Sequence, residues 1–195
     1  DEAGYKDVDG DGMREKPDGS KLQINFLAMS GGDIAEPLSQ FYIQCWRDVG
    51  LDVGLQNGRL IEMNAFYDMV EEDNEDIDIY MGAWQTGSNP DPSGFYGRNS
   101  MFNYSRFASD KNDELLAAIA SEDAIGEDGI DYDYLVKAYH DWQDNMVEQA
   151  PVVPTHYRVT LGVVNKRVSY YDLGLVTDWR WEKVGLLADK PELAK

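Results

Sequence analysis

The sequence predicts an α/β domain with a mixed or largely parallel sheet flanked by helices. Segments that alternate apolar and polar side chains are predicted strands and comprise residues 21–29, 51–55 and 76–81. Segments that repeat apolar side chains at helical spacing are predicted helices and comprise residues 33–49, 61–72, 110–122 and 131–149. This order of strands and helices is typical of α/β domains.

The first strand and helix show these patterns most clearly. In the strand, Ile24 and Phe26 are separated by a polar residue, which predicts one buried face. Two glycines end the strand. Asp33, followed three residues later by Glu36, then forms a predicted capping box at the start of the helix. Gly50 is the predicted end of that helix.

The second half of the chain is less regular. Residues 85–109 are rich in Gly, Asn, Ser, Pro and aromatic side chains, and loops of this length usually carry function. An acidic linker at residues 122–129 joins the last two helices. Residues 152–165 are a predicted strand, and a final strand or turn is expected near residues 173–181.

The composition excludes several classes of function. The chain has 195 residues and a net charge of −20, which disfavours binding to nucleic acid and to anionic membrane surfaces. It contains no apolar run long enough for a transmembrane helix and no signal peptide, and its start resembles the middle of a longer sequence. Cys45 is the sole cysteine, so no intrachain disulfide can form.

The predicted fold indicates where a ligand binds. In open α/β sheets, ligands lie beyond the carboxyl ends of the strands. Residues 83–95 leave the third strand at such an end and are therefore the default binding segment. Two interpretations of Trp84 stay open, because its indole could form an apolar wall for a ligand or lie in the core beneath the loop.

The amino-terminal loop matches the first half of a calcium-binding loop. Asp7, Asp9 and Asp11 occupy the first, third and fifth positions, and Gly12 occupies the sixth. Asp18 stands at the closing position, where a glutamate would be the stronger ligand. A bound Ca²⁺ is therefore one prediction, and a hydrogen-bonded acidic turn without metal is the alternative.

The sequence does not support an enzyme. His140 and His156 are the only histidines, and their spacing does not suit a zinc site. No Gly-x-Ser-x-Gly motif presents a nucleophilic serine. No cofactor is required by this interpretation, although Ca²⁺ stays open.

Several ordered motifs resemble a known family. They are the Gly4–Lys16 acidic loop, Asp48-Val49-Gly50-Leu51-Asp52-Val53, Asp76-Ile77-Asp78-Ile79-Tyr80-Met81-Gly82-Ala83-Trp84, Asn89-Pro90-Asp91-Pro92 and Pro151-Val152-Val153-Pro154. Together they resemble the second lobe of family-5 extracellular solute-binding proteins, the oligopeptide- and dipeptide-binding components of ABC transporters. The run from Thr86 to Gly97 resembles members from Gram-positive bacteria.

The resemblance implies a lobe of the periplasmic-binding-protein type II fold. It implies one half of a clamp that closes on an oligopeptide and delivers it to the permease subunits of an importer. The partner lobe would be the amino-terminal lobe of the same protein. Residues 1–166 would form the ligand-binding lobe, and residues 167–195 a tail that returns to that first lobe. The intact protein would be extracellular and lipid-anchored, or periplasmic. A calcium-binding adhesion module and a lobe for a non-peptide solute are the alternatives.

The resemblance also places the ligand-binding residues around the end of the third strand. Relatives often have an aspartate after the tryptophan that pairs with the ligand's ammonium group, whereas Gly87 and Ser88 occupy the matching positions here. Asp91 lies further along the chain and is the hypothetical substitute if the loop folds back. Backbone groups of residues 83–86 would pair with the peptide as an added strand. The candidate residues are Ala83, Trp84, Gln85, Thr86, Gly87, Ser88, Asn89, Asp91, Phe95 and Tyr104. An exposed apolar patch is expected around Trp84 and Tyr104.

Overall fold

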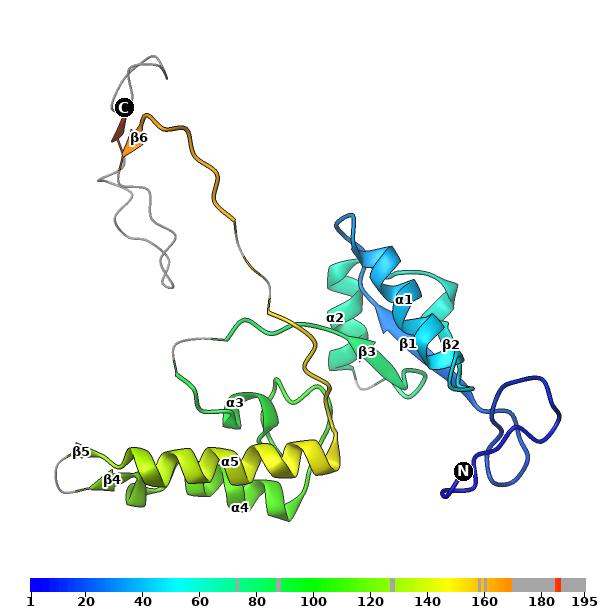
Figure 1. Ribbon diagram of the computed structural model, residues 1–195, viewed down its shortest axis with the longest axis horizontal. Coiled ribbons are helices and arrows are strands. Elements are labelled where there is room, and N and C mark those ends of the chain that lie inside the picture. The colour runs from blue at the N-terminus through cyan, green and yellow to red at the C-terminus, as the bar shows by residue number, and fades with distance from the viewer. Residues whose placement is uncertain are drawn as a thin grey trace. The chain divides into compact units, whose positions relative to one another are not determined.

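The computed structural model describes residues 1–72, 74–86, 89–126, 129–157, 159, 161–169 and 185–186 (Figure 1). The chain separates into two units, Asp1–Val152 and Val153–Lys195. In the second unit, β6 (Val168–Ser169) pairs antiparallel with β7 (Gly185–Leu186). The predicted division between residues 166 and 167 concerns the intact protein and stays a prediction.

A three-stranded parallel sheet organises the first unit. The elements in chain order are β1 (Gln23–Ala28), α1 (Ala35–Arg47), β2 (Asp52–Leu55), η1 (Gln56–Gly58), α2 (Met63–Glu71), β3 (Ile79–Met81), α3 (Ser93–Tyr96), α4 (Asp110–Ile119), η2 (Glu122–Ala124), β4 (Ile125–Gly126), β5 (Gly129–Ile130) and α5 (Tyr132–Gln149). Strand β1 lies in the middle of the order β2-β1-β3 and pairs in parallel with both neighbours. The predicted α/β fold with helices beside a parallel sheet is therefore confirmed.

Successive residues of β1 supply the cores on the two faces of the sheet. Phe26 and Ala28 pack with Ile43 of α1 on one face. Leu27 packs with Phe66 and neighbouring residues of α2 on the other. Because side chains alternate along a strand, one short buried strand anchors a helix on each face.

A pair of helices follows the long loop after β3. Helices α4 and α5 pack against each other (Figure 1), and the Tyr134 hydroxyl donates to the Ala118 carbonyl at 3.0 Å. Ser109 caps α4 by accepting from the Asn112 amide, and Asp131 caps α5 by accepting from the Tyr134 amide. The segment predicted as an acidic linker includes η2 and β4, and β4 pairs antiparallel with β5.

The predicted capping box at the start of α1 is wrong. Ile34 occupies the N-cap position, and no side chain caps the helix there. Gly31 and Gly32 both have positive φ, and after this turn Ile34 already has helical dihedrals. Asp33 therefore lies one residue too early. The predicted end of the helix is confirmed, because Gly50 has a φ of +84° and its amide donates to the Arg47 carbonyl.

The predicted strand at residues 152–165 is also wrong for the described residues, none of which is in a strand there. The alternating pattern is present, and Tyr157, Leu161 and Val163 are all strongly exposed. A strand also needs a hydrogen-bonded neighbour, and this segment has none among the residues described. The strand or turn expected near residues 173–181 lies outside the described residues.

In the described part of the chain, no helix has the length and apolar character needed to cross a membrane.

Candidate functional site

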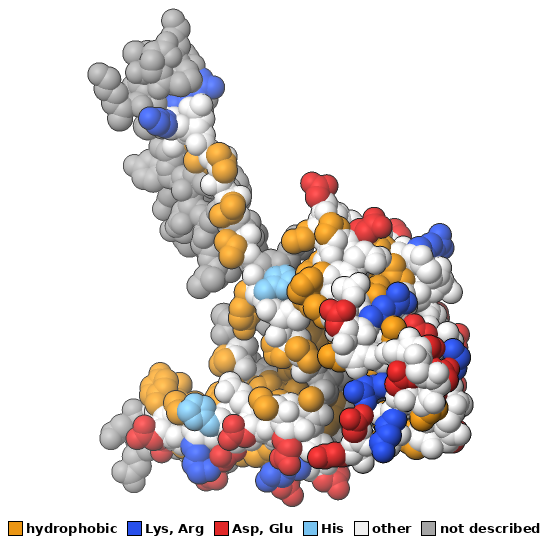
Figure 2. Space-filling model, turned by 45° about the vertical axis from the view of Figure 1, so that its right-hand side comes forward, with side chains coloured by type: hydrophobic (Ala, Val, Ile, Leu, Met, Phe, Trp, Pro, Cys, Tyr) orange, Lys and Arg blue, Asp and Glu red, His pale blue; other side chains and the backbone are white. Residues whose placement is uncertain are grey.

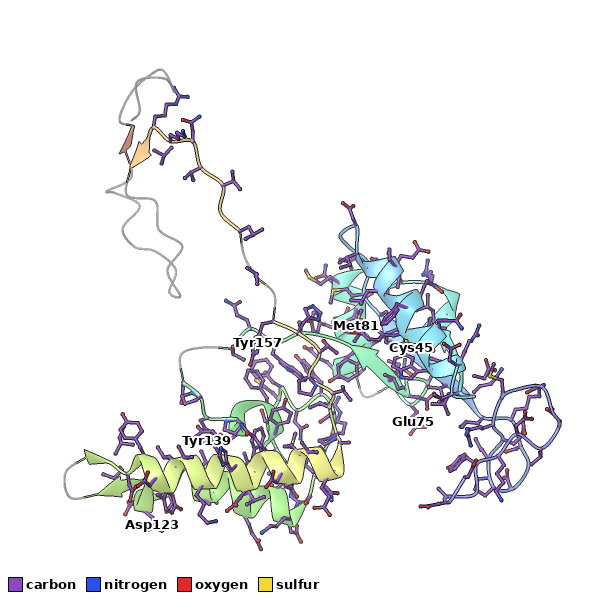
Figure 3. The ribbon with its side chains drawn as sticks, in the orientation of Figure 1. Cys45, Glu75, Met81, Asp123, Tyr139 and Tyr157 are labelled. Carbon is purple, nitrogen blue, oxygen red and sulfur yellow. The ribbon has the colours of Figure 1, made fainter. Side chains whose placement is uncertain are left out.

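The segment that leaves β3 carries Trp84 into a group of aromatic rings. Met81 ends the strand, and its position is labelled in Figure 3. The Trp84 ring is nearly parallel to that of Tyr104, with centroids 6.5 Å apart and an interplanar angle of 14°. It also lies 5.8 Å from Phe95. We call these residues the Trp84 cluster, which comprises Tyr67, Trp84, Phe95, Tyr96, Phe102 and Tyr104.

Hydrogen bonds connect helix α2 to the Trp84 cluster and to the loop that follows it. The Tyr67 hydroxyl donates to the Ala83 carbonyl at 3.2 Å, and the Tyr104 hydroxyl donates to the Glu71 carboxylate at 3.0 Å. The Arg106 guanidinium donates to the carbonyl of Glu71 at 3.1 Å and to that of Val70 at 2.9 Å. A cation at a helix carboxyl terminus is electrostatically favourable. These contacts hold the loop against the end of α2.

Two buried asparagines fix the backbone of the long loop. The Asn103 side-chain amide donates to the carbonyls of Gly97 and Phe107. Asn112, which is fully buried, donates to the Tyr96 carbonyl at 2.8 Å and accepts from the Trp142 indole at 3.1 Å. Asn112 therefore connects α3, α4 and α5, and it holds the backbone of a residue in the Trp84 cluster.

The predicted binding residues fall into three groups. Ala83, Gln85, Thr86 and Asn89 are exposed. Trp84, Asp91, Phe95 and Tyr104 are half-buried. Gly87 and Ser88 lie outside the described residues. Among the exposed group, residues 83–86 form no backbone–backbone hydrogen bond with any described residue.

Asp91 is already engaged in a local interaction. Its carboxylate accepts from the Ser93 amide at 2.9 Å and from the Ser93 hydroxyl at 2.8 Å. These contacts lie at the start of α3 and are typical of a local turn. An ammonium group would have to share the Asp91 oxygens with Ser93. The contact with a ligand amine therefore stays a prediction.

The expected apolar patch has a different composition from the one predicted. Trp84 and Tyr104 cover each other's faces, so both are half-buried. Phe102, which contacts Phe95 and Tyr104, is 44% exposed and presents the outer edge of the cluster. Helical spacing predicted Tyr67 only as an apolar residue of α2. Nothing in the local sequence indicated that its hydroxyl contacts Ala83.

Burial raises the pKa of two phenols, Tyr104 in the Trp84 cluster and Tyr80 in β3. It raises the pKa of Tyr80 to about 12. Burial, together with the hydrogen bond to Glu71, also raises the pKa of Tyr104. Both phenols stay neutral at physiological pH and can donate hydrogen bonds. The Tyr80 hydroxyl and the Trp84 indole nitrogen are buried without a hydrogen-bond partner in the described part of the chain.

The acidic loop brings together a different set of carboxylates from the one predicted. Oxygens of Asp7, Asp9 and Glu15 lie within 4.8 Å of one another. Glu15 is buried and was not predicted. The remaining predicted ligands contact other groups. Asp11 accepts from the Met13 amide and pairs with Lys21, and Asp18 accepts from the Ser20 amide and hydroxyl.

Hydrogen bonds make both of these outlying carboxyl groups more acidic. The Met13 amide is the largest cause lowering the pKa of Asp11, and the Ser20 hydroxyl is the largest cause lowering that of Asp18. Asp7 accepts from the amides of Gly10 and Gly12, so backbone donors shape the turn. Three close oxygen donors fit a hard cation such as Ca²⁺. Binding of Ca²⁺ at this loop stays a prediction.

The sequence and the fold match known proteins. The family model "Bacterial extracellular solute-binding proteins, family 5 Middle" matches residues 1–105. The oligopeptide-binding protein OppA of Lactococcus lactis subsp. lactis (strain IL1403) is 32% identical over 196 residues, which cover 97% of this chain and 31% of that protein. This chain thus spans about a third of the length of its curated relatives.

Solved structures match over most of the chain. A lactococcal OppA complexed with an endogenous peptide in the closed conformation has a TM-score of 0.82 and 29% identity, covering 95% of this chain and 34% of that one. AppA from Bacillus subtilis in complex with a nonapeptide has a TM-score of 0.62 and 24% identity, covering 77% of this chain and 28% of that one. At that lower identity the similarity concerns the fold alone.

Proposed function

The chain belongs to the family-5 bacterial extracellular solute-binding proteins, and we propose that it forms one lobe of a clamp that captures oligopeptides for an ABC importer. Proteins of this family bind solutes and are not enzymes. The observation that carries the proposal is the exit of β3, where residues 83–86 form no backbone–backbone hydrogen bond with any described residue and lie beside the Trp84 cluster. Relatives named as oligopeptide-binding proteins support peptides as the ligand class.

The proposed binding mode separates affinity from specificity. The backbone of residues 83–86 pairs with the peptide main chain, which tolerates many sequences because every residue offers the same groups. The faces and edges of the Trp84 cluster contact peptide side chains through apolar surface. The bonds from Tyr67 and Tyr104 to Ala83 and Glu71 fix these surfaces before the ligand arrives. A preorganised surface loses less conformational entropy on binding.

Isothermal titration tests this proposal. The full-length parent protein is titrated with a mixed oligopeptide pool, as wild type and as Trp84→Ala. The substitution is expected to weaken binding roughly tenfold or more, because truncating an aromatic anchor commonly costs over about 1–2 kcal/mol. Tyr132→Ala is the control, because Tyr132 is 70% exposed on α5 and lies outside the Trp84 cluster.

The possible results of this titration distinguish the peptide-binding function from the location of the binding site. If Trp84→Ala weakens binding and Tyr132→Ala does not, the peptide receptor and its site are both supported. If peptides bind equally well to both variants, the ligand lies elsewhere in the protein. If no peptide binds, a non-peptide solute becomes the leading alternative. Figure 2 shows many acidic side chains on the surface, so neutral and basic solutes are the first to test.

The acidic loop supports a structural calcium site formed by Asp7, Asp9 and Glu15, whose oxygens lie within 4.8 Å. Calcium that binds only the folded protein raises its stability by about 2.7 kcal/mol at a hundredfold excess over Kd. We expect Ca²⁺ to raise the thermal midpoint and Asp7→Asn to abolish the rise. Asp18→Asn is the matched control, because Asp18 lies outside this cluster.

A rise that survives Asp7→Asn would contradict the site, and so would no rise at all. Loss of the rise on Asp18→Asn would instead favour the ligand set predicted from loop positions. The calcium-dependent adhesion module, the alternative to a peptide receptor, would additionally require calcium-dependent contact with another macromolecule.

The remaining features of the intact protein follow from the proposed role. Residues 167–195 return to the amino-terminal lobe, and the loaded protein docks on the permease subunits. Family membership places the protein outside the cell, and a lipid anchor would keep it beside the importer. The exposed, alternating apolar residues Tyr157, Leu161 and Val163 support a strand that pairs with a part of the protein beyond this chain.

A further inference from the structure

The first main-chain carbonyl of the proposed peptide-binding segment already has a hydrogen-bond partner. The Tyr67 hydroxyl donates to the Ala83 carbonyl oxygen at 3.2 Å. Among the residues that the structure describes, none donates a hydrogen bond to the carbonyls of residues 84–86. The carbonyls along residues 83–86 therefore differ as acceptors for a ligand.

Two ring contacts hold the Tyr67 side chain in this position. Its ring meets that of Phe66 edge-on, with centroids 5.1 Å apart, and Phe66 is fully buried in the core between α2 and the sheet. The Tyr67 ring also lies 6.2 Å from that of Tyr104. Because Phe66 and Tyr104 already restrict the ring, the hydrogen bond to Ala83 orders little additional side chain.

Gly82 allows the chain to leave β3 close to α2. A Cβ at Gly82 would lie 3.1 Å from Cε2 of the Tyr80 ring, which is shorter than an ordinary carbon contact of about 3.5 Å. The same Cβ would lie 3.8 Å from the Phe66 ring. The backbone thus passes close to these two rings, and the next residue, Ala83, is the one that Tyr67 contacts.

We propose that Tyr67 sets the register of a bound peptide, an inference that depends on the proposed function. A peptide that adds as a strand donates its N–H groups to main-chain carbonyls of the protein. At Ala83 a peptide N–H would have to share the oxygen with the Tyr67 hydroxyl. The peptide therefore donates to carbonyls of residues 84–86 instead. Tyr67 is thus a positioning residue that acts on the peptide through Ala83.

The register decides which ligand side chains reach the Trp84 cluster. Every residue of a peptide offers the same main-chain groups, so several alignments along residues 83–86 would otherwise be nearly equivalent. A slip by one residue moves each side chain of a strand to the opposite face. A carbonyl that is occupied at one end of the segment therefore selects among these alignments and contributes to specificity.

N-methyl scanning of a peptide tests this role. The probe is a nonapeptide of alanines and lysines with one central phenylalanine, prepared as a series in which one amide at a time is N-methylated. Lysines suit the net charge of −20. Methylation removes a donor, so it weakens binding most where that N–H donates to the protein. The series is titrated into the full-length parent protein, as wild type and as Tyr67→Phe, which keeps the ring.

The pattern of sensitive amides is the expected difference. In the wild type, methylation of an amide that donates to residues 84–86 is expected to raise Kd roughly fivefold or more. In Tyr67→Phe the Ala83 carbonyl loses its partner, so one further amide should become sensitive. Tyr42→Phe is the matched control, because Tyr42 is a half-buried tyrosine of α1 that packs on Trp46, outside the Trp84 cluster. It should leave the pattern unchanged.

An identical pattern in the wild type and Tyr67→Phe would overturn the register role. This holds even if Tyr67→Phe binds the whole series more weakly, because a tyrosine that only supports the segment would lower all affinities evenly. A pattern that changes equally in Tyr42→Phe would overturn it as well. If the unmethylated peptide binds the wild type but no methylation matters, backbone pairing fails, and the role of Tyr67 fails with it. If the unmethylated peptide does not bind the wild type, the result contradicts the proposed function itself.

Discussion

Replacing Phe66 by alanine is expected to lower the free energy of unfolding by about 3–5 kcal/mol, the range for large-to-small substitutions at buried phenylalanines. Phe66 is fully buried between α2 and the sheet, where it packs with Leu27 and Val70. Its ring also meets Tyr67 edge-on at 5.1 Å. The alanine would leave a cavity in the close-packed core between α2 and the sheet.

Urea unfolding of the chain, followed by circular dichroism, measures this loss. Phe41→Ala is the matched control, because it makes the same change within a helix at a ring that is 60% exposed. This control is expected to cost less than about 1 kcal/mol, because its ring already contacts water. Equal losses at the two positions would mean that α2 does not pack on the sheet as described.

The same substitution should also disturb the candidate binding site. Phe66 holds α2 against β1, and α2 carries Tyr67 and Glu71, which contact Ala83 and Tyr104. Movement of α2 would therefore loosen the segment after β3 as well as the core. We therefore expect the candidate site to depend on a core residue that lies outside the Trp84 cluster.

The sheet and its two helices were predictable because their signals are local. Side-chain alternation in β1 and helical spacing in α1 and α2 each reflect a buried face that is repeated along a single segment. The strand predicted at residues 152–165 shows the limit of this reasoning. Its alternation describes a segment able to pair, whereas pairing depends on a neighbour that the segment itself does not specify.

The candidate site was predictable only in part for a related reason. The end of β3 and Trp84 followed from the order of the elements and from the family resemblance. The contacts of Tyr67 and Glu15 join positions that no periodic pattern connects, so sequence reasoning missed both. The capping box predicted at Asp33 was wrong because two glycines with positive φ changed the entry into α1 by one residue.

Asn112→Ala is expected to lower the free energy of unfolding by about 3 kcal/mol, because it leaves two polar groups unpaired at about 1–3 kcal/mol each. Asn112 is fully buried. Its amide donates to the Tyr96 carbonyl, and its oxygen accepts from the Trp142 indole. The same urea unfolding measures the loss. Lys111→Ala, at the neighbouring exposed position, is the control and should change stability by less than about 0.5 kcal/mol.

Two further variants separate the lost hydrogen bonds from the lost volume. Asn112→Leu keeps most of the side-chain volume but leaves the Tyr96 carbonyl and the Trp142 indole unpaired, so it should destabilise nearly as much as Asn112→Ala. Trp142→Phe removes the indole donor. In the Asn112→Ala background it should therefore cost about 1 kcal/mol less than in the wild type. Strict additivity of the two changes would contradict the Asn112–Trp142 bond. A mild effect of Asn112→Leu would show that Asn112 mainly fills space between α4 and α5, leaving other contacts to hold Tyr96 beside Trp84.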